Sequence, residues 1–201
     1  MRTIIELRGP SNCGKTEAIT LAAKKRLASG ATLVAKELRR TNIEIVEVYA
    51  VKHKKGTSYV AYISQGDERK YVEKALAILN IFVDVAIKGA DLIEDVTNIE
   101  IQYGESKPSK KNLGIYKNMR HTLLSIGKEF HIDIIVIACH NDAGEKGSTI
   151  DAINKYVNKN DSIELKEKVH VDVNAPNLIQ EMAKANDTCA SEINVLVDKS
   201  L

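Results

Sequence analysis

Eight residues near the start of the chain have the types and spacing that bind phosphate. The segment Gly9-Pro10-Ser11-Asn12-Cys13-Gly14-Lys15-Thr16 matches G-x-x-x-x-G-K-[ST] at every fixed position. Its glycines let the loop turn backbone N–H groups inward, and the amino end of a following helix adds a positive dipole there. Lys15 would contact the terminal phosphates of a nucleoside triphosphate, and the Thr16 hydroxyl would ligate Mg²⁺. The pattern predicts a triphosphate site formed by Gly9, Ser11, Asn12, Cys13, Gly14, Lys15 and Thr16.

The residues on both sides of this loop predict the elements that position it. Residues 3–8 are typical of a strand, and 15–29 are typical of a helix that ends at Gly30. A strand, then the glycine-rich loop, then a helix is the context that the motif requires. Glu6 and Arg8 are unusual in a strand that should be central, and we expect them to face its less buried side.

Further strand and helix patterns alternate along the chain, which predicts an α/β fold with a mostly parallel sheet between helices. Residues 43–51 and 58–64, joined by 52–57, predict one antiparallel hairpin. The continuous apolar run 132–139 is typical of a central parallel strand, with Cys139 as a core residue. We expect helices over 67–80, 115–130 and up to about 158, a strand near 165–173, and a helix whose first turn contains Pro176. The patterns leave residues 81–93 and the last ten residues open between helix and strand.

The length of 201 residues and the ordinary composition predict a single domain over residues 1–201. Residues 97–112 are polar and contain Gly104 and Pro108, so they predict a lid or an insertion. Three of its lysines could contact polyanions, although a solvated loop also explains them: Lys107, Lys110 and Lys111.

The motif and its flanking elements resemble the P-loop NTPase superfamily. In layout the chain is similar to small kinase-like members and to uncharacterised ATP-binding proteins of phages and mobile elements. The resemblance implies a three-layer P-loop fold and a carboxylate, at the end of a neighbouring strand, that supports Mg²⁺. Asp67 is the preferred acid because Tyr62-Ile63-Ser64-Gln65-Gly66 leads into it from a strand. Asp142 and Asp84 remain alternatives.

Phosphoryl transfer in such proteins commonly uses arginines as well as the loop lysine. The chain has only seven arginines. Arg69 follows the preferred acid and is our first candidate for catalysis with Lys15 and Asp67; Arg39, Arg40 and Arg120 are further candidates. His140 follows the central strand and is interpreted as a capping or packing residue, with a catalytic base as the alternative.

Net charge, cysteine usage and hydropathy exclude several classes. The formal net charge of +2 gives no overall indication of nucleic-acid binding. The three cysteines are widely spaced and predict neither a disulfide framework nor a zinc site. No apolar stretch approaches the roughly 20 residues of a membrane-spanning helix, and the first residues do not resemble a signal peptide. We therefore expect a cytoplasmic protein without a membrane partner.

Two functions fit these patterns, and the sequence does not decide between kinase and hydrolase. The first is a small phosphotransferase, similar to nucleoside or nucleotide kinases, that uses Mg²⁺ and ATP with an unknown small-molecule or macromolecular acceptor. The alternative is an ATPase or nucleotide switch acting with a protein or nucleic-acid partner, which could supply an arginine. A structural nucleotide is a third reading. ATP is expected rather than GTP because Asn154-Lys155 is followed by Tyr156-Val157 and does not complete N-K-x-D.

Overall fold

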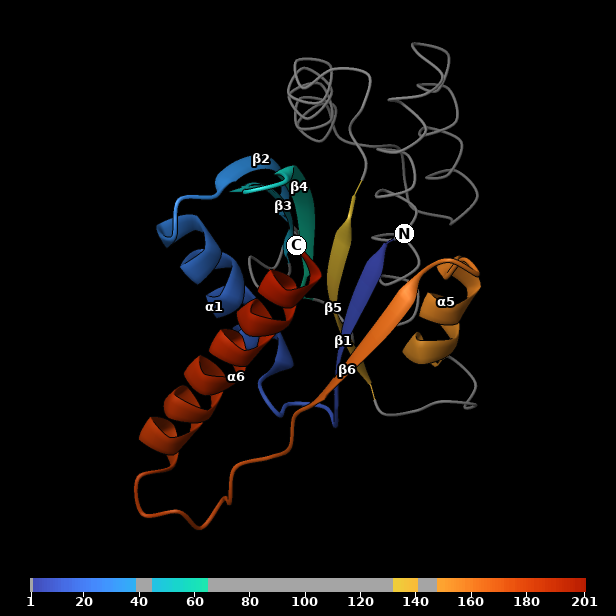
Figure 1. Ribbon diagram of the computed structural model, residues 1–201. Coiled ribbons are helices and arrows are strands. Elements are labelled where there is room, and N and C mark those ends of the chain that lie inside the picture. The colour runs from blue at the N-terminus through green and yellow to red at the C-terminus, as the bar shows by residue number, and fades with distance from the viewer. Residues whose placement is uncertain (1, 39–44, 65–131, 141–147) are drawn as a thin grey trace, which may run out of the picture.

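The computed structural model describes residues 2–38, 45–64, 132–140 and 148–201, and the element labels are those of Figure 1. These residues form the strands and helices β1 (Thr3–Gly9), α1 (Lys15–Ala28), β2 (Thr32–Leu38), β3 (Ile45–His53), β4 (Gly56–Ile63), β5 (Ile134–His140), α5 (Thr149–Tyr156), β6 (Ser162–Glu167) and α6 (Leu178–Ser200). No helix in this part of the chain is both long and apolar enough to cross a membrane.

The six described strands form one mixed sheet in the order β2-β3-β4-β5-β1-β6. Strands β4, β5, β1 and β6 pair in parallel, whereas β3 is antiparallel to both of its neighbours, β2 and β4. The sheet is therefore parallel around β1 and antiparallel at the β2 edge. This arrangement gives β1, which leads into the glycine-rich loop, a parallel partner on each side.

Helices cover both faces of the sheet (Figure 1). On one face, α1 and α6 pack together over alternate residues of the central strands, including Ile5, Leu7 and Val136. On the other face, α5 packs over the intervening residues, including Ile4 and Ile135. Because side chains of a strand alternate between faces, the nearly continuous apolar sequence of β5 supplies both cores.

Local signals explain where several elements begin and turn. Gly56 has φ 144°, a conformation that favours glycine, and it follows the turn at Lys54 and Lys55 that joins β3 to β4. The helix α5 begins after Ser148, whose hydroxyl accepts a hydrogen bond from the backbone N of Asp151 at 3.1 Å. Gly30, with φ 97°, ends α1 as its sequence position predicts.

The predicted α/β architecture, with a sheet flanked by helices and an antiparallel hairpin, is confirmed. Buried Cys139 also lies in the core, as predicted. The antiparallel part is larger than expected, because β2 adds a strand that the sequence analysis did not predict. The strand expected near 165–173 is wrong in its bounds, since β6 covers Ser162–Glu167. The prediction that Pro176 lies in the first turn of a helix is wrong, because α6 begins at Leu178, after the N-cap Asn177. The helix continues through most of the last ten residues, which the sequence left open.

Several predictions concern residues outside the described ranges. These are the elements over 67–80, 81–93 and 115–130, the lid at 97–112, and the site candidates Asp67, Arg69, Asp84, Arg39, Arg40, Arg120 and Asp142.

Candidate functional site

The carboxyl ends of three parallel strands meet beside the glycine-rich loop. Strand β5 pairs with β1 on one side and with β4 on the other, and Gly9 lies opposite His140 in the β1–β5 register. The first strand, the strand that leads toward Asp67 and the strand that ends at His140 therefore end at one edge of the sheet. Ligands of open α/β sheets bind at this edge, so the fold places the loop where a ligand site is expected.

The loop begins with a glycine because the backbone of another segment passes close to it. A Cβ built on Gly9 would lie 2.3 Å from the backbone O of Lys168 and 2.8 Å from Sγ of Cys13. Lys168 directly follows β6, and its backbone N donates to the backbone O of Arg8 at 2.8 Å. Only glycine therefore fits between the end of β1 and the chain that leaves β6.

The second fixed glycine and the residue Asn12 give the loop its curvature. Gly14 has φ 90° and Asn12 has φ 60°, which are both left-handed conformations. These conformations are typical of glycine and, less often, of asparagine. Gly14 is also the N-cap of α1, and as a glycine it has no side chain that could cap this helix. The first turn of α1 therefore presents backbone N–H donors, together with the positive end of the helix dipole, at the loop.

Lys15 is the first residue of α1, and its side chain bends back over the loop. Its Nζ donates to the backbone O of Gly9 at 3.0 Å and to that of Pro10 at 2.7 Å. The side chain is buried, with only 4% of the residue exposed. The neutral carbonyl oxygens of Gly9 and Pro10 thus hold the ammonium group against the start of the loop. Phosphate oxygens could replace these carbonyl oxygens as its partners.

Thr16 joins the loop to the end of β4. Its Oγ1 donates to the backbone O of Ser64 at 3.0 Å, and Ser64 follows β4 directly. The hydroxyl expected to ligate Mg²⁺ therefore lies next to the strand that leads toward Asp67 in the sequence. The hydrogen bond places the loop and the end of β4 in contact.

Glu6 and Arg8 correct the expectation that both face the less buried side of β1. The Glu6 side chain is completely buried, whereas that of Arg8 is 26% exposed. Arg8 donates from Nε at 2.9 Å and from Nη2 at 2.6 Å to the same oxygen, Oε2 of Glu6. Among the described residues, Glu6 Oε1 is one of two buried side-chain atoms without a hydrogen-bond partner. The sequence contained one indication of this buried pair, because two charged residues are unusual in a central strand.

The pKa of the Cys139 thiol is affected by several charged groups near the ends of β1 and β5. Burial is the main cause that raises the pKa of this thiol to about 12, and the nearby Glu6 carboxylate adds to the increase. Arg8 and Lys15 act in the opposite direction because their positive charges favour the thiolate. Both cations therefore lie within electrostatic range of the same sulfur at the end of β5.

His140 forms part of the connection between β5 and α5. Its backbone N donates to Oγ1 of Thr149 at 2.8 Å, and Thr149 is the fully buried first residue of α5. This backbone contact joins the end of β5 to the start of α5.

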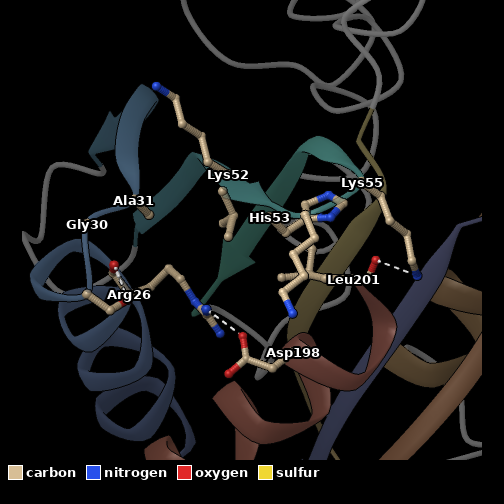
Figure 2. Close-up of a pocket in the computed structure, with 11 residues that line it drawn as sticks. Arg26, Gly30, Ala31, Lys52, His53, Lys55, Asp198 and Leu201 are labelled. Carbon is tan, nitrogen blue, oxygen red and sulfur yellow. Dashed lines mark hydrogen bonds and ion pairs between the residues drawn. The ribbon is translucent and has the colours of Figure 1, made fainter.

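Among the cavities lined by described residues, one lies beside the loop and another lies far from it. A cavity of about 360 Å³ is lined by residues 166–171 and by one side of α6, and it reaches the loop through Lys168. A cavity of about 470 Å³ lies at the amino end of β4, between the hairpin tip and the last turns of α1 and α6 (Figure 2). The second cavity is therefore at the opposite end of the sheet from the loop.

The distant cavity is basic, and two of its cations have structural partners. Arg26 pairs with Asp198 at 2.7 Å, and Nζ of Lys55 donates to the backbone O of Leu201 at 3.4 Å (Figure 2). The carboxyl ends of α1 and α6 carry partial negative charge, which attracts basic side chains. We therefore assign the candidate site to the glycine-rich loop.

No family model, curated protein or solved structure matches this chain in comparisons with known proteins. The functional argument consequently depends on the loop and its surroundings.

Proposed function

We propose that this chain is a P-loop protein that binds ATP with Mg²⁺ and acts as a small phosphotransferase. The observation that carries the proposal is the position of the Lys15 ammonium, which contacts the carbonyl oxygens of Gly9 and Pro10 at the amino end of α1, where the N-cap residue is a glycine. A lysine charge and a set of N–H donors at one point are complementary to a triphosphate.

The residues of the loop fit this ligand. The N–H groups around Gly14 would bind phosphate oxygens, and Lys15 would exchange loop carbonyls for the terminal phosphates. Thr16 would hold Mg²⁺ through the hydroxyl that contacts Ser64 O in this structure. The ion, when bound, would neutralise charge on the phosphates. Asp67 remains the proposed second support of the metal, and Arg69 a proposed catalytic residue.

The nucleoside has a suitable cavity beside the loop. The cavity between residues 166–171 and α6 has a volume of about 360 Å³, within the range of roughly 300–1,000 Å³ for small-molecule sites. Its border includes Val169, which is 73% exposed although apolar. ATP is proposed rather than GTP because the N-K-x-D element is not completed at Asn154.

Nucleotide titration of Lys15→Ala tests the proposal. Loss of a charged partner to the phosphates should weaken Mg²⁺-dependent ATP binding by about 100-fold, the equivalent of about 2.7 kcal/mol. The circular dichroism spectrum should remain that of the wild type. Lys24→Ala is the matched control, because Lys24 is an exposed lysine of the same helix. Wild-type affinity in Lys15→Ala would contradict the proposal.

Product analysis distinguishes the phosphotransferase from the alternative ATPase or switch. Labelled ATP should be incubated with the protein and with a panel of nucleosides and nucleotides. Transfer of the labelled phosphate to an acceptor supports the phosphotransferase, whereas release of phosphate alone supports a hydrolase. A partner-dependent increase in phosphate release would support the switch.

A further inference from the structure

The Glu6–Arg8 ion pair carries a free-energy cost because Glu6 is buried in the sheet. Glu6 lies in the central strand β1, and its register partners on the neighbouring strands are Ile137 and Leu165. Burial of a carboxylate carries a desolvation penalty of several kcal/mol, which an ion pair offsets only when hydrogen bonding is complete. Here Arg8 contacts one carboxylate oxygen, and the other oxygen is buried without a partner. Stability alone does not explain a charged pair at this position.

The location of Arg8 suggests what the pair does. Arg8 immediately precedes Gly9, the first residue of the loop, and its guanidinium lies on the face of β1 opposite α1. Two of its nitrogens bond Glu6, while the side chain is 26% exposed. A guanidinium has additional N–H donors and a planar shape that matches phosphate oxygens. Arg8 therefore combines a fixed position with the capacity to contact a ligand.

A second observation relates Arg8 to the phosphate end of the proposed site. Lys15 marks that end, and its Nζ donates at 3.0 Å to the backbone O of Gly9, the residue that follows Arg8. Cys139 is the register partner of Arg8 on β5. Arg8 therefore lies at the carboxyl edge of the sheet, next to the residue whose backbone O holds the Lys15 ammonium.

We infer that Arg8 is a second phosphate-binding cation, which contacts the terminal phosphate of the bound triphosphate, and that Glu6 is its positioning residue. This inference rests on the proposed function. The carboxylate holds the guanidinium at the strand end before the ligand arrives, so that little side-chain entropy is lost on binding. An arginine from β1 would also supply positive charge in a chain that has few arginines.

The test compares the affinities of ATP and ADP, each with Mg²⁺. Arg8→Gln should weaken ATP binding by about 10-fold or more, since a hydrogen bond to a charged group contributes roughly 1.5–3 kcal/mol. ADP, which lacks the terminal phosphate, should bind as it does to the wild type. Glu6→Gln should also reduce the preference for ATP, but by a smaller factor, because Arg8 loses its charged partner. A purely structural role would leave the ratio of the two affinities unchanged.

Arg2→Gln is the matched control. Arg2 lies before the amino end of β1 and pairs with Asp161 at 2.8 Å, so its loss removes a similar ion pair far from the loop. The ratio of ATP to ADP affinity should not change in this variant. If Arg8→Gln fails to fold, the double variant Glu6→Leu with Arg8→Met replaces the pair by apolar residues, an exchange that is often neutral for stability. It should show the same loss of ATP preference.

The outcomes separate this inference from the proposed function. If the wild type binds neither nucleotide, both are wrong. If the wild type binds ATP, Lys15→Ala loses that binding and Arg8→Gln keeps the wild-type ratio, only the role of Arg8 is overturned. An equal loss of ATP and ADP in Arg8→Gln would also overturn it, since the contact would then not involve the terminal phosphate.

Discussion

Gly9→Ala is the substitution for which the structure gives the clearest steric reason. The added Cβ would lie 2.3 Å from the backbone O of Lys168. This oxygen cannot move away unless the end of β6 moves with it. It would also lie 2.8 Å from Sγ of Cys13 within the loop. The end of β1 and the chain after β6 must separate, and this separation strains the hydrogen bond from Lys168 N to Arg8 O.

The expected loss of stability follows from two opposing contributions. Gly9 is not among the residues with positive φ, so alanine could adopt its backbone conformation and would gain about 0.4–1 kcal/mol through the unfolded state. Overpacking costs about 1–3 kcal/mol, and a clash with a backbone atom belongs at the upper end. The net decrease in the free energy of unfolding is about 2 kcal/mol. At roughly 2–4 °C per kcal/mol, Tm should fall by about 4–8 °C.

Thermal unfolding and ATP titration together test this reasoning. Gly9→Ala should lower both Tm and ATP affinity, because Gly9 O is also a partner of Lys15. Gly30→Ala is the control: Gly30 has φ 97° but no atom within 4 Å of an added Cβ. That variant should lose about 1–2 kcal/mol of stability through backbone strain and keep the wild-type affinity. A Tm for Gly9→Ala at or above that of the wild type would refute the steric argument.

Two further predictions concern stability away from the loop. Burial disfavours ionised Asp161, but hydrogen bonds from the backbone and from Arg2 outweigh this, so its pKa lies below the ordinary value. The ionised carboxylate stabilises the fold above about pH 4, and this contribution is lost as the pH falls through the lowered pKa. The Tm of Asp161→Asn should therefore decrease less between neutral and acidic pH than the Tm of the wild type does. Tyr62→Phe removes a buried hydroxyl that accepts from Arg26 and donates to Asn194 at 2.9 Å. Urea unfolding should show a loss of about 1–2 kcal/mol, with ATP affinity unchanged.

The parts of the fold that were predicted correctly have strong local signals. The first strand, the loop and α1 follow from a fixed motif with apolar patterns on both sides. The hairpin follows from two β-rich segments around a short polar connection that contains Gly56. The central strand β5 follows from a continuous apolar run. In each case, residues close in sequence contain most of the information.

The errors occur where a strand depends on a distant partner. Strand β2 contains Ala, Lys, Glu and Leu, which favour helices, and its extended form depends on pairing with β3. Residues 169–173 alternate as a strand would, but β6 ends at Glu167. The register gives the reason: Glu167 pairs with Arg8, and the next residue of β1, Gly9, leads into the loop. Among the residues that the structure describes, no strand continues the pairing beyond Lys168.

The candidate site shows the same division between local and distant information. The motif identified Lys15 and Thr16, whereas the contact between Thr16 and Ser64 joins segments that are distant in the sequence. The burial of Glu6 was not foreseen, because the exposure of a strand face depends on the elements that cover it. A charge that is expected on a less buried face costs little and needs no explanation. The same charge at 0% exposure, paired with the residue before the loop, is costly and therefore supports a role in ligand binding.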